Sequence, residues 1–208
     1  MEDHVKRRGA TLIFALGFLV LTGCAGTGEV IPLQVRPVLE KAAQPAKDIR
    51  VSIGPFEDER EFKTGLGTRT HLWGGVSYFD MKGGDPGDVV AQALTEYLTS
   101  KGWHVTKFGT TDASDVTLTG KIQELFVHAK SRFGSTELTA KTKFAMRATN
   151  AADGSIVRMT LNGSGEEDVF WFDNEDMEAV LNEVLTDSFS KLIQDTKVEN
   201  KMLRLKQQ

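Results

Sequence analysis

The chain has 208 residues, and its 25 basic and 29 acidic side chains give a formal net charge of −4. This length fits one or two domains, and an apolar content of 40% excludes wholesale disorder and a polytopic membrane protein. Mild acidity argues against a nucleic-acid-binding protein, which needs clustered Lys and Arg to displace counterions. A single cysteine, Cys24, excludes an intrachain disulfide and a multi-cysteine metal site.

The first 23 residues have the pattern of a secretory signal peptide. Lys6, Arg7 and Arg8 precede an uninterrupted apolar run over residues 11–21. Such a run rises about 16 Å as a helix, roughly half the hydrocarbon core of a bilayer, so it is too short to span. A basic flank, a short apolar run and a small residue before the cut predict cleavage between Gly23 and Cys24.

Residues 21–24 read Leu-Thr-Gly-Cys and resemble the lipobox of bacterial lipoproteins. The resemblance implies a diacylglycerol on the sulfur of Cys24 and, in most cases, an acyl chain on its new amine. Two or more chains anchor a protein stably, whereas one holds it marginally. Ala25 stands where an Asp commonly retains such proteins at the inner membrane, which favours the outer membrane. The alternative is a free cysteine beside an ordinary cleavage site.

Residues 24–48 are rich in Gly and Pro and have little periodicity. They predict a lipidated N-terminus followed by a flexible tether, which lets the folded body stand off the bilayer. A short strand around residues 30–35 is left open within this tether.

The first half of the predicted domain contains a strand, a helix and a second strand. Residues 49–56 alternate apolar and polar side chains until Gly54-Pro55 ends the strand. Asp85 and Pro86 predict a capped helix start, and Gly102 a helix end. Residues 103–108 then read as a short strand.

The second half is predicted as a meander of three long strands followed by a helix. Alternation begins at Val116 and slips near Glu124, which indicates a bulge. Hairpin turns follow near residues 130–135 and 150–154. Asp173 is a predicted helix cap, and an apolar stripe continues to about Gln194. The basic tail at residues 199–208 is predicted to fray.

These elements predict an α+β fold in the order β-α-β-β-β-β-α. Two helices on one face of a mostly antiparallel sheet give a two-layer sandwich, and residues 49–198 form its single domain.

Residues 180–198 of the final helix, together with residues 100–105 and 58–60, resemble the YajG family of bacterial lipoproteins. The order of elements is similar over about residues 49–198. The resemblance implies an outer-membrane lipoprotein that faces the periplasm, and it implies no established reaction. The architecture alone is also similar to LpoB-type synthase activators and CsgG-type secretion lipoproteins, but a shared fold does not fix a function. The Gly-rich stretch 61–84 is not part of the resemblance.

That stretch holds the aromatic candidates for partner binding, Trp73, Tyr78 and Phe79. Trp and Tyr on an exposed loop anchor protein interfaces or stack on sugars. The alternative is that the stretch folds over the sheet as a hairpin with Gly74 and Gly75 at the turn.

Asp58 and Arg60 follow the first strand and have two interpretations. They orient a ligand or partner at the end of the sheet, or they form a turn salt bridge. A small hydrolase or ligand carrier would need both to share a cleft with His71. No nucleophile elbow, phosphate loop or metal-ligand spacing occurs in the sequence, so it predicts no catalytic residue, cofactor or metal.

The sequence therefore predicts a non-enzymatic lipoprotein, held by Cys24 at the periplasmic side of the outer membrane, that binds an envelope protein or peptidoglycan. Two alternatives stay open: a structural subunit of a secretion or flagellar assembly, and a small ligand carrier or hydrolase.

Overall fold

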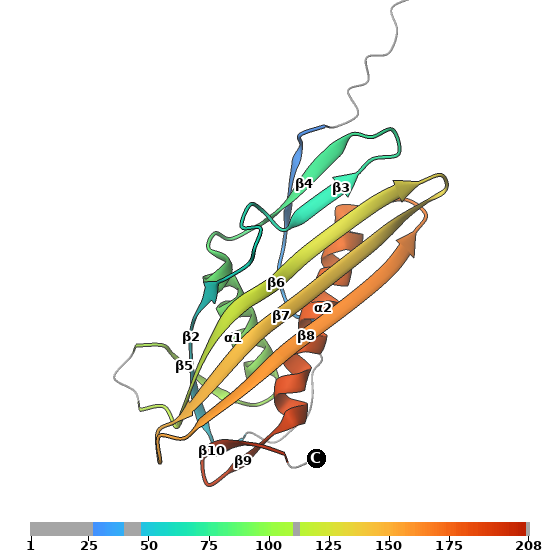
Figure 1. The fold of residues 1–208 in the computed structure, drawn as a ribbon. Coiled ribbons are helices and arrows are strands. Elements are labelled where there is room, and N and C mark those ends of the chain that lie inside the picture. Colours follow the sequence, from blue (N-terminus) through green and yellow to red (C-terminus); the bar gives the residue numbers. More distant parts are fainter. Residues whose placement is uncertain (1–26, 40–46, 110–112, 207–208) are drawn as a thin grey trace, which may run out of the picture.

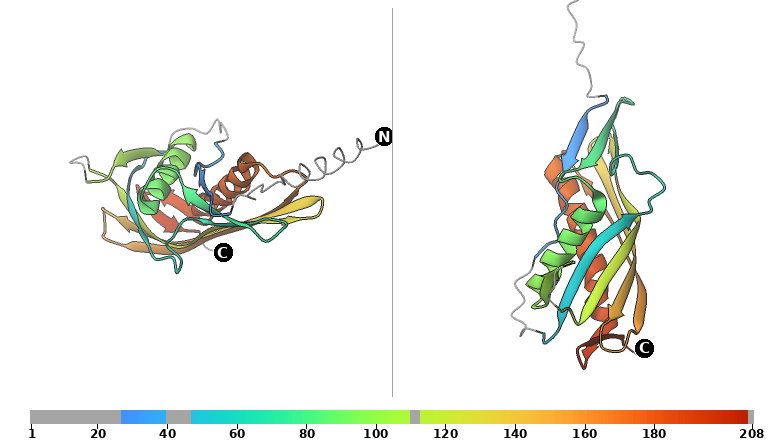
Figure 2. Two further views of the ribbon diagram at one scale, coloured as in Figure 1. Left: turned by 90° about the horizontal axis from the view of Figure 1, so that it is seen from above. Right: turned by 90° about the vertical axis from the view of Figure 1, so that its left-hand side faces the viewer.

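The computed structural model describes residues 27–39, 47–109 and 113–206. They form one curled sheet whose concave side holds two helices, with a small C-terminal hairpin beyond its lower end (Figures 1 and 2). The signal segment, Gly23 and Cys24 lie outside the described residues, so cleavage and lipidation stay predictions. Neither helix in the described part of the chain combines the length and apolar character that a membrane span requires.

The described residues form ten strands and two helices. In chain order they are β1 (Val30–Leu33), β2 (Arg50–Asp58), β3 (Gly67–Thr70), β4 (Val76–Met81), α1 (Pro86–Ser100), β5 (His104–Lys107), β6 (Val116–Arg132), β7 (Ser135–Asn150), β8 (Ile156–Val169), α2 (Asn174–Asp195), β9 (Thr196–Glu199) and β10 (Met202–Leu205).

The eight-stranded sheet is mixed. Strands β6, β7 and β8 form the predicted antiparallel meander. However, β2 pairs in parallel with both β5 and β6, β3 pairs in parallel with β6, and β1 pairs in parallel with β4. The α+β class is confirmed, whereas the mostly antiparallel two-layer sandwich is replaced by a mixed half-barrel. The predicted order is incomplete because β1, β3, β4, β9 and β10 are too short or too irregular to show a period.

Strand β6 changes its partner along its length. Its pairing with β7 shifts between Ile122 and Glu124, which confirms the predicted bulge. Before the bulge β6 pairs with β2, and beyond it with β3. Gly67 permits this second pairing, because a Cβ there would lie 1.8 Å from the carbonyl oxygen of Val127. Strand β2 also continues past its predicted end, since Gly54 and Pro55 form an irregularity rather than a stop.

Both helices begin at their predicted caps. The side chain of Asp85 accepts from the N–H of Gly87 at 2.8 Å. Asp173 accepts from the N–H of Glu175 at 3.2 Å, and its own N–H donates to Asp176 at 2.9 Å, which completes a capping box. The apolar stripes of both helices are buried in one core, where Phe189 of α2 packs against a ring of β7 and a ring of α1.

Part of the expected tether belongs to the folded body. Strand β1 pairs with β4, and Leu33 is fully buried. Alternate backbone N–H groups of the next residues donate at 2.7 Å to side chains spaced four apart on one face of α2: Gln34 to Glu178, Arg36 to Asn182, and Val38 to Thr186. Residues 27–39 therefore belong to the fold although they precede its predicted start at residue 49, because α2 supplies the polar partners that this irregular segment lacks.

The described part of the basic tail, residues 199–206, is also folded rather than frayed. Strands β9 and β10 pair through a tight turn at Asn200 and Lys201, which have φ of 51° and 58°. Leu203 is fully buried, and its N–H donates to the side chain of Asn150 at 2.8 Å. A long-range hydrogen bond and one buried side chain thus hold a segment whose charge alone suggested disorder.

Candidate functional site

The Gly-rich stretch contains a β-hairpin, which is the second of its two interpretations. Strands β3 and β4 pair from Gly67↔Phe79 to Thr70↔Val76, with a turn between them. Adjacent residues of a strand face opposite sides of the sheet. Tyr78 is half-exposed on the convex face of the sheet, opposite the helices, which we call the open face. Phe79 is fully buried, with its ring centroid 6.2 Å from that of Phe172. Phe79 is therefore a core residue, and its assignment to a partner-binding surface is not supported.

Asp58 and Arg60 form a structural ion pair. The guanidinium of Arg60 donates to both carboxylate oxygens of Asp58, at 2.9 and 3.0 Å. It also donates to the carbonyl oxygen of Gly65 at 2.9 Å. The hydrogen bonds that Arg60 donates to Asp58 lower the pKa of this carboxyl group. Since Arg60 is only 5% exposed and its donors are engaged, the pair fastens the loop between β2 and β3 rather than presenting free charges to a ligand.

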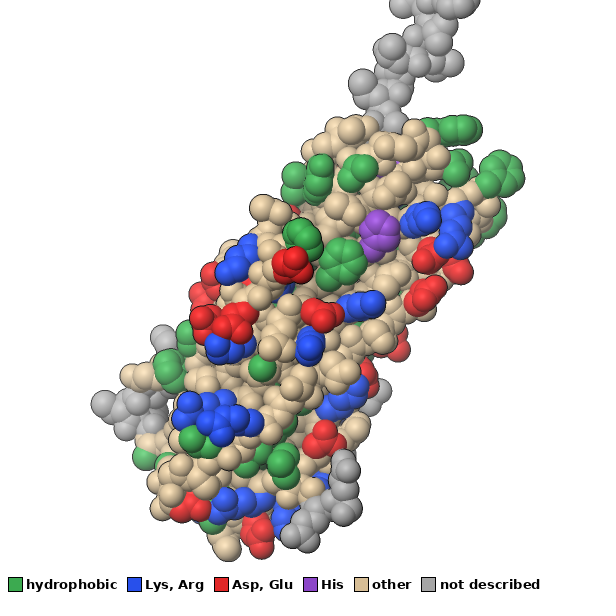
Figure 3. Space-filling view, in the orientation of Figure 1, with side chains coloured by type: hydrophobic (Ala, Val, Ile, Leu, Met, Phe, Trp, Pro, Cys, Tyr) green, Lys and Arg blue, Asp and Glu red, His purple; other side chains and the backbone are tan. Residues whose placement is uncertain are grey.

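The fastened loop forms one wall of an apolar groove on the open face. The groove has a volume of about 560 Å³, and it lies between the loop, the β3–β4 hairpin and β6. Its lining includes three aromatic side chains, two leucines and four charged side chains: Phe62, Tyr78 and Phe126, Leu66 and Leu125, and Arg60, Glu61, Glu124 and Lys141. Figure 3 shows hydrophobic side chains gathered over this part of the face, among isolated charges.

One aromatic wall of this groove, Phe126, is held in place. The ring of Phe126 stacks on His128 with a 9° interplanar angle and a 6.3 Å centroid separation. The Nδ1 of His128 shares a 3.2 Å hydrogen bond with the hydroxyl of Thr68 on β3. No local pattern in the sequence singles out Phe126, because only the β3–β6 register brings it into one groove with Tyr78.

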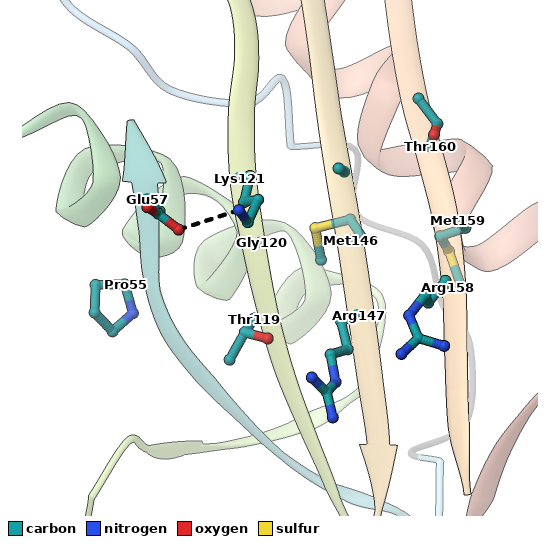
Figure 4. A pocket seen from close by; sticks show the side chains of 11 residues that line it. Pro55, Glu57, Thr119, Gly120, Lys121, Met146, Arg147, Arg158, Met159 and Thr160 are labelled. Carbon is teal, nitrogen blue, oxygen red and sulfur yellow. Dashed lines mark ion pairs between the residues drawn. The ribbon is translucent and has the colours of Figure 1, made fainter. Parts of the chain in front are cut away.

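A second hollow on the open face is basic. It has a volume of about 810 Å³ and lies over β2, β6, β7 and β8 (Figure 4). Arg147 and Arg158 are direct cross-strand partners within it, and no ion pair is recorded for either among the described residues. Lys121, at the same hollow, is paired with Glu57 at 3.4 Å. Like charges placed directly opposite destabilise a sheet, so the stability of the fold does not explain why Arg147 faces Arg158. We call these two arginines the basic pair.

The residues required for a hydrolase do not meet in one cleft. His71 lies in the β3–β4 turn, where its Nε2 shares a 2.7 Å hydrogen bond with Ser77. Arg60 lines the apolar groove, but His71 does not. Within residues 27–39, 47–109 and 113–206, no group of three His, Cys, Asp or Glu side chains is arranged to hold a metal ion.

The family model described as uncharacterised lipoprotein matches residues 84–203. The chain belongs to this YajG-like lipoprotein family. The match extends over α1 and the strands from β5 to β9, and it ends at Leu203 within β10. The β3–β4 hairpin lies outside the matched residues, whereas Phe126, Arg147 and Arg158 lie within them. No curated protein sequence matches this chain.

Solved structures are similar to this chain at low sequence identity. A protein of Xanthomonas campestris is 11% identical, with a TM-score of 0.51 over 80% of this chain and 93% of that one. The PelC dodecamer of Paraburkholderia phytofirmans gives 10% identity and a TM-score of 0.38, over 71% and 92% of the two chains. A lipoprotein of Neisseria meningitidis gives 13% identity and a TM-score of 0.33, over 64% and 92%. The first of these supports the fold alone.

Proposed function

We propose that this protein is a non-enzymatic lipoprotein, anchored through Cys24 to the periplasmic side of the outer membrane, that binds an envelope protein in the apolar groove. The observation that carries the binding proposal is the trio Phe62, Tyr78 and Phe126 around one groove. Membership of a lipoprotein family and the lipobox-like residues support the anchor. Ala25 supports the outer membrane over the inner.

The groove has the anatomy of a small protein-binding site. Its aromatic centre and charged rim match the layout of interfaces, in which Tyr and Phe anchor the core and polar groups surround it. A volume of about 560 Å³ accommodates a few apolar side chains of a partner segment. Because Arg60 fixes the loop and His128 fixes Phe126, binding need not order these walls, which lowers its entropic cost.

In-cell photo-crosslinking tests this proposal directly. A photo-reactive residue replaces Phe126 in one strain and Phe62 in another, so that both probes lie in the groove. We expect both to give an adduct with the same envelope protein. A probe at Thr160, which lines the basic hollow instead, is the matched control and should not give that adduct. Deleting residues 61–84 is not a suitable test, because it removes β3, β4 and the buried Leu66 and Phe79.

A second measurement distinguishes a protein partner from a cell-wall glycan. The crosslinked adduct should be lost when Tyr78→Ala is added, while the control Phe108→Ala, which replaces a half-exposed ring outside the groove, leaves it unchanged. Sedimentation with purified peptidoglycan should be the same for wild type and Tyr78→Ala. Peptidoglycan binding that depends on Tyr78, without a protein adduct, would contradict the choice of partner. Failure of both assays would end the groove proposal.

A further inference from the structure

Four of the five most exposed aromatic side chains among the described residues lie at one end of the molecule. Five large apolar side chains of the described residues are more than 70% exposed. One of them, Phe62, belongs to the groove. The other four are in turns: Trp73 at 89%, Phe133 at 95%, Phe170 at 72% and Trp171 at 81%.

Strand register places these turns together. Thr70 of β3 pairs with Lys130 of β6, so the turn that carries Trp73 adjoins the end of β6. The next turn, between β6 and β7, carries Phe133. Thr136 of β7 pairs with Val169 of β8, which places Phe170 and Trp171 beside it. Figures 1 and 2 show the three turns at the end of the molecule where β1 begins. We call the set Trp73, Phe133, Phe170 and Trp171 the aromatic tip.

The described chain also starts at this end. The N–H of Gly28 donates to the carbonyl oxygen of Val76 at 2.7 Å. A Cβ on Gly75 would lie 2.8 Å from the hydroxyl of Thr27, so Thr27 contacts the turn that carries Trp73. Cys24 precedes Thr27 by three residues, which span at most about 10 Å when fully extended. A lipid on Cys24 therefore keeps this end within that reach of the bilayer surface.

We propose that the aromatic tip rests in the membrane surface, with its four rings among the lipid headgroups and the long axis of the domain standing away from the bilayer. This rests on the lipid anchor of the proposed function. Trp is enriched at the membrane interface, where its ring contacts apolar groups and its N–H stays hydrated. The tip thus gives the anchored domain a fixed orientation, with the apolar groove facing the periplasm above the membrane.

Charge limits how the tip inserts. Glu166, Glu167 and Asp168 lie just behind Phe170 in the sequence, so insertion stops at the headgroup level. Arg132, next to Phe133, is paired with Glu137. Because the tip carries no excess of cations, its contact with lipid does not depend on anionic headgroups. The occupant that fits is an uncharged or zwitterionic lipid surface.

A second copy of the chain is the main competing occupant, since an exposed aromatic patch also promotes self-association. The short distance between Thr27 and Cys24 favours lipid as the occupant, because a lipid on Cys24 keeps the tip close to the bilayer whether or not a second copy is nearby. Phe170 and Trp171 project together, with centroids 5.4 Å apart and an 88° interplanar angle. Two rings side by side present a broad apolar surface, which suits contact with a flat bilayer better than insertion into the pocket of a protein partner.

Tryptophan quenching by brominated phosphatidylcholine provides the test, with the mature lipidated protein reconstituted into vesicles. The sequence has three tryptophans, and Trp103 is only 3% exposed in the core. We expect shallow bromine labels to quench wild-type emission. The variant Trp73→Phe/Trp171→Phe keeps only Trp103 and should lose that quenching. Vesicles with and without anionic lipid should give the same result.

Vesicle flotation separates this proposal from the anchor itself. If wild type floats with vesicles but its tryptophans are not quenched beyond Trp103 alone, the tip proposal is wrong while the anchor stands. If the wild-type protein does not float, the anchor is wrong. Phe133→Ser should reduce quenching of the tip tryptophans, and Phe62→Ser, which replaces another exposed ring but one outside the tip, should not. A solution oligomer that Phe133→Ser dissociates, without any quenching by lipid, would assign the tip to self-association and overturn the proposal.

Discussion

The two ends of this domain differ: one is closed by buried contacts, and the other exposes aromatic rings. At the end away from the aromatic tip, the β7–β8 turn meets the C-terminal hairpin through polar side chains. Asn150 is fully buried, and its side chain pairs with both backbone groups of Leu203. At the tip, by contrast, the turns carry exposed rings. The closed end pairs its buried polar groups by internal hydrogen bonds, whereas the tip leaves apolar surface for a partner outside the domain to cover.

This difference separates stability from function along the molecule. The closed end buries an apolar side chain and its polar partners, so changes there should lower the free energy of unfolding. The rings of the tip are mostly exposed, so changes there should leave the fold intact and alter only binding. Variants of the two ends, measured for both properties, test whether the division is real.

Leu203→Ala should have the largest effect on stability. Leu203 is fully buried in β10, and truncation of a buried leucine removes packing and leaves a cavity. We expect the free energy of unfolding, measured by urea denaturation, to fall by about 3 kcal/mol. Leu205→Ala is the matched control, since Leu205 lies two residues away and is half-exposed; it should change stability by less than about 0.5 kcal/mol. Equal effects of the two would show that the hairpin is not packed on the domain.

Asn150→Ala should have the next largest effect. Its side-chain N–H₂ donates to the carbonyl oxygen of Leu203 at 3.1 Å, and its oxygen accepts from the N–H of the same residue at 2.8 Å. Alanine leaves both buried backbone groups unpaired, so we expect a loss of about 2 kcal/mol. Hydrogen exchange should show faster exchange at the Leu203 amide first. An unchanged rate there would contradict the role assigned to Asn150.

The closed end should also respond to acid. Hydrogen bonds from Ser155, and then from Arg204, lower the pKa of Asp153 to about 2. A lowered pKa means that the ionised form stabilises the fold above the unfolded value near pH 4, and that this contribution is lost as the pH falls from about 4 towards 2. Asp153→Asn should therefore be less stable than wild type at pH 6, and the two should converge near pH 2. Ser155→Ala should reduce the difference in the same window, because its hydroxyl donates to Asp153 at 2.6 Å.

The sequence was sufficient for elements with a clear period and a local signal. The caps at Asp85 and Asp173 and the bulge near Glu124 depend on residues close in the chain, and all three are confirmed. The hairpin in residues 61–84 was one of two predicted alternatives. Its aromatic residues could not be sorted between core and surface, because the face of a short strand depends on what it packs against.

What the sequence could not give depends on contacts between distant residues. The segment that follows β1, residues 34–38, is held by α2 side chains that lie 144–148 residues away, and β10 is held by Asn150. Neither dependence leaves a periodic pattern. The groove and the basic pair likewise exist only through register: Phe126 meets the β3–β4 hairpin through β6, and Arg147 meets Arg158 across β7 and β8. The short reach from Cys24 to the fold likewise depends on distant contacts, those of Thr27 and Gly28 with the β3–β4 hairpin.

Changes at the tip should have the smallest effect on stability. Trp171→Ser replaces a ring that is mostly exposed, and its recorded ring contact is the edge of Phe170, so we expect the free energy of unfolding to change by less than about 0.5 kcal/mol. The same substitution should remove much of the quenching by brominated lipid. Phe172→Ser, one residue further on, is the contrasting variant: Phe172 packs on the buried Phe79 and lies under the guanidinium of Arg69 at 3.8 Å. It should destabilise the fold while both tip tryptophans remain present. If Trp171→Ser proved as destabilising as Phe172→Ser, the exposed rings would belong to the core, and the two ends would not differ in kind.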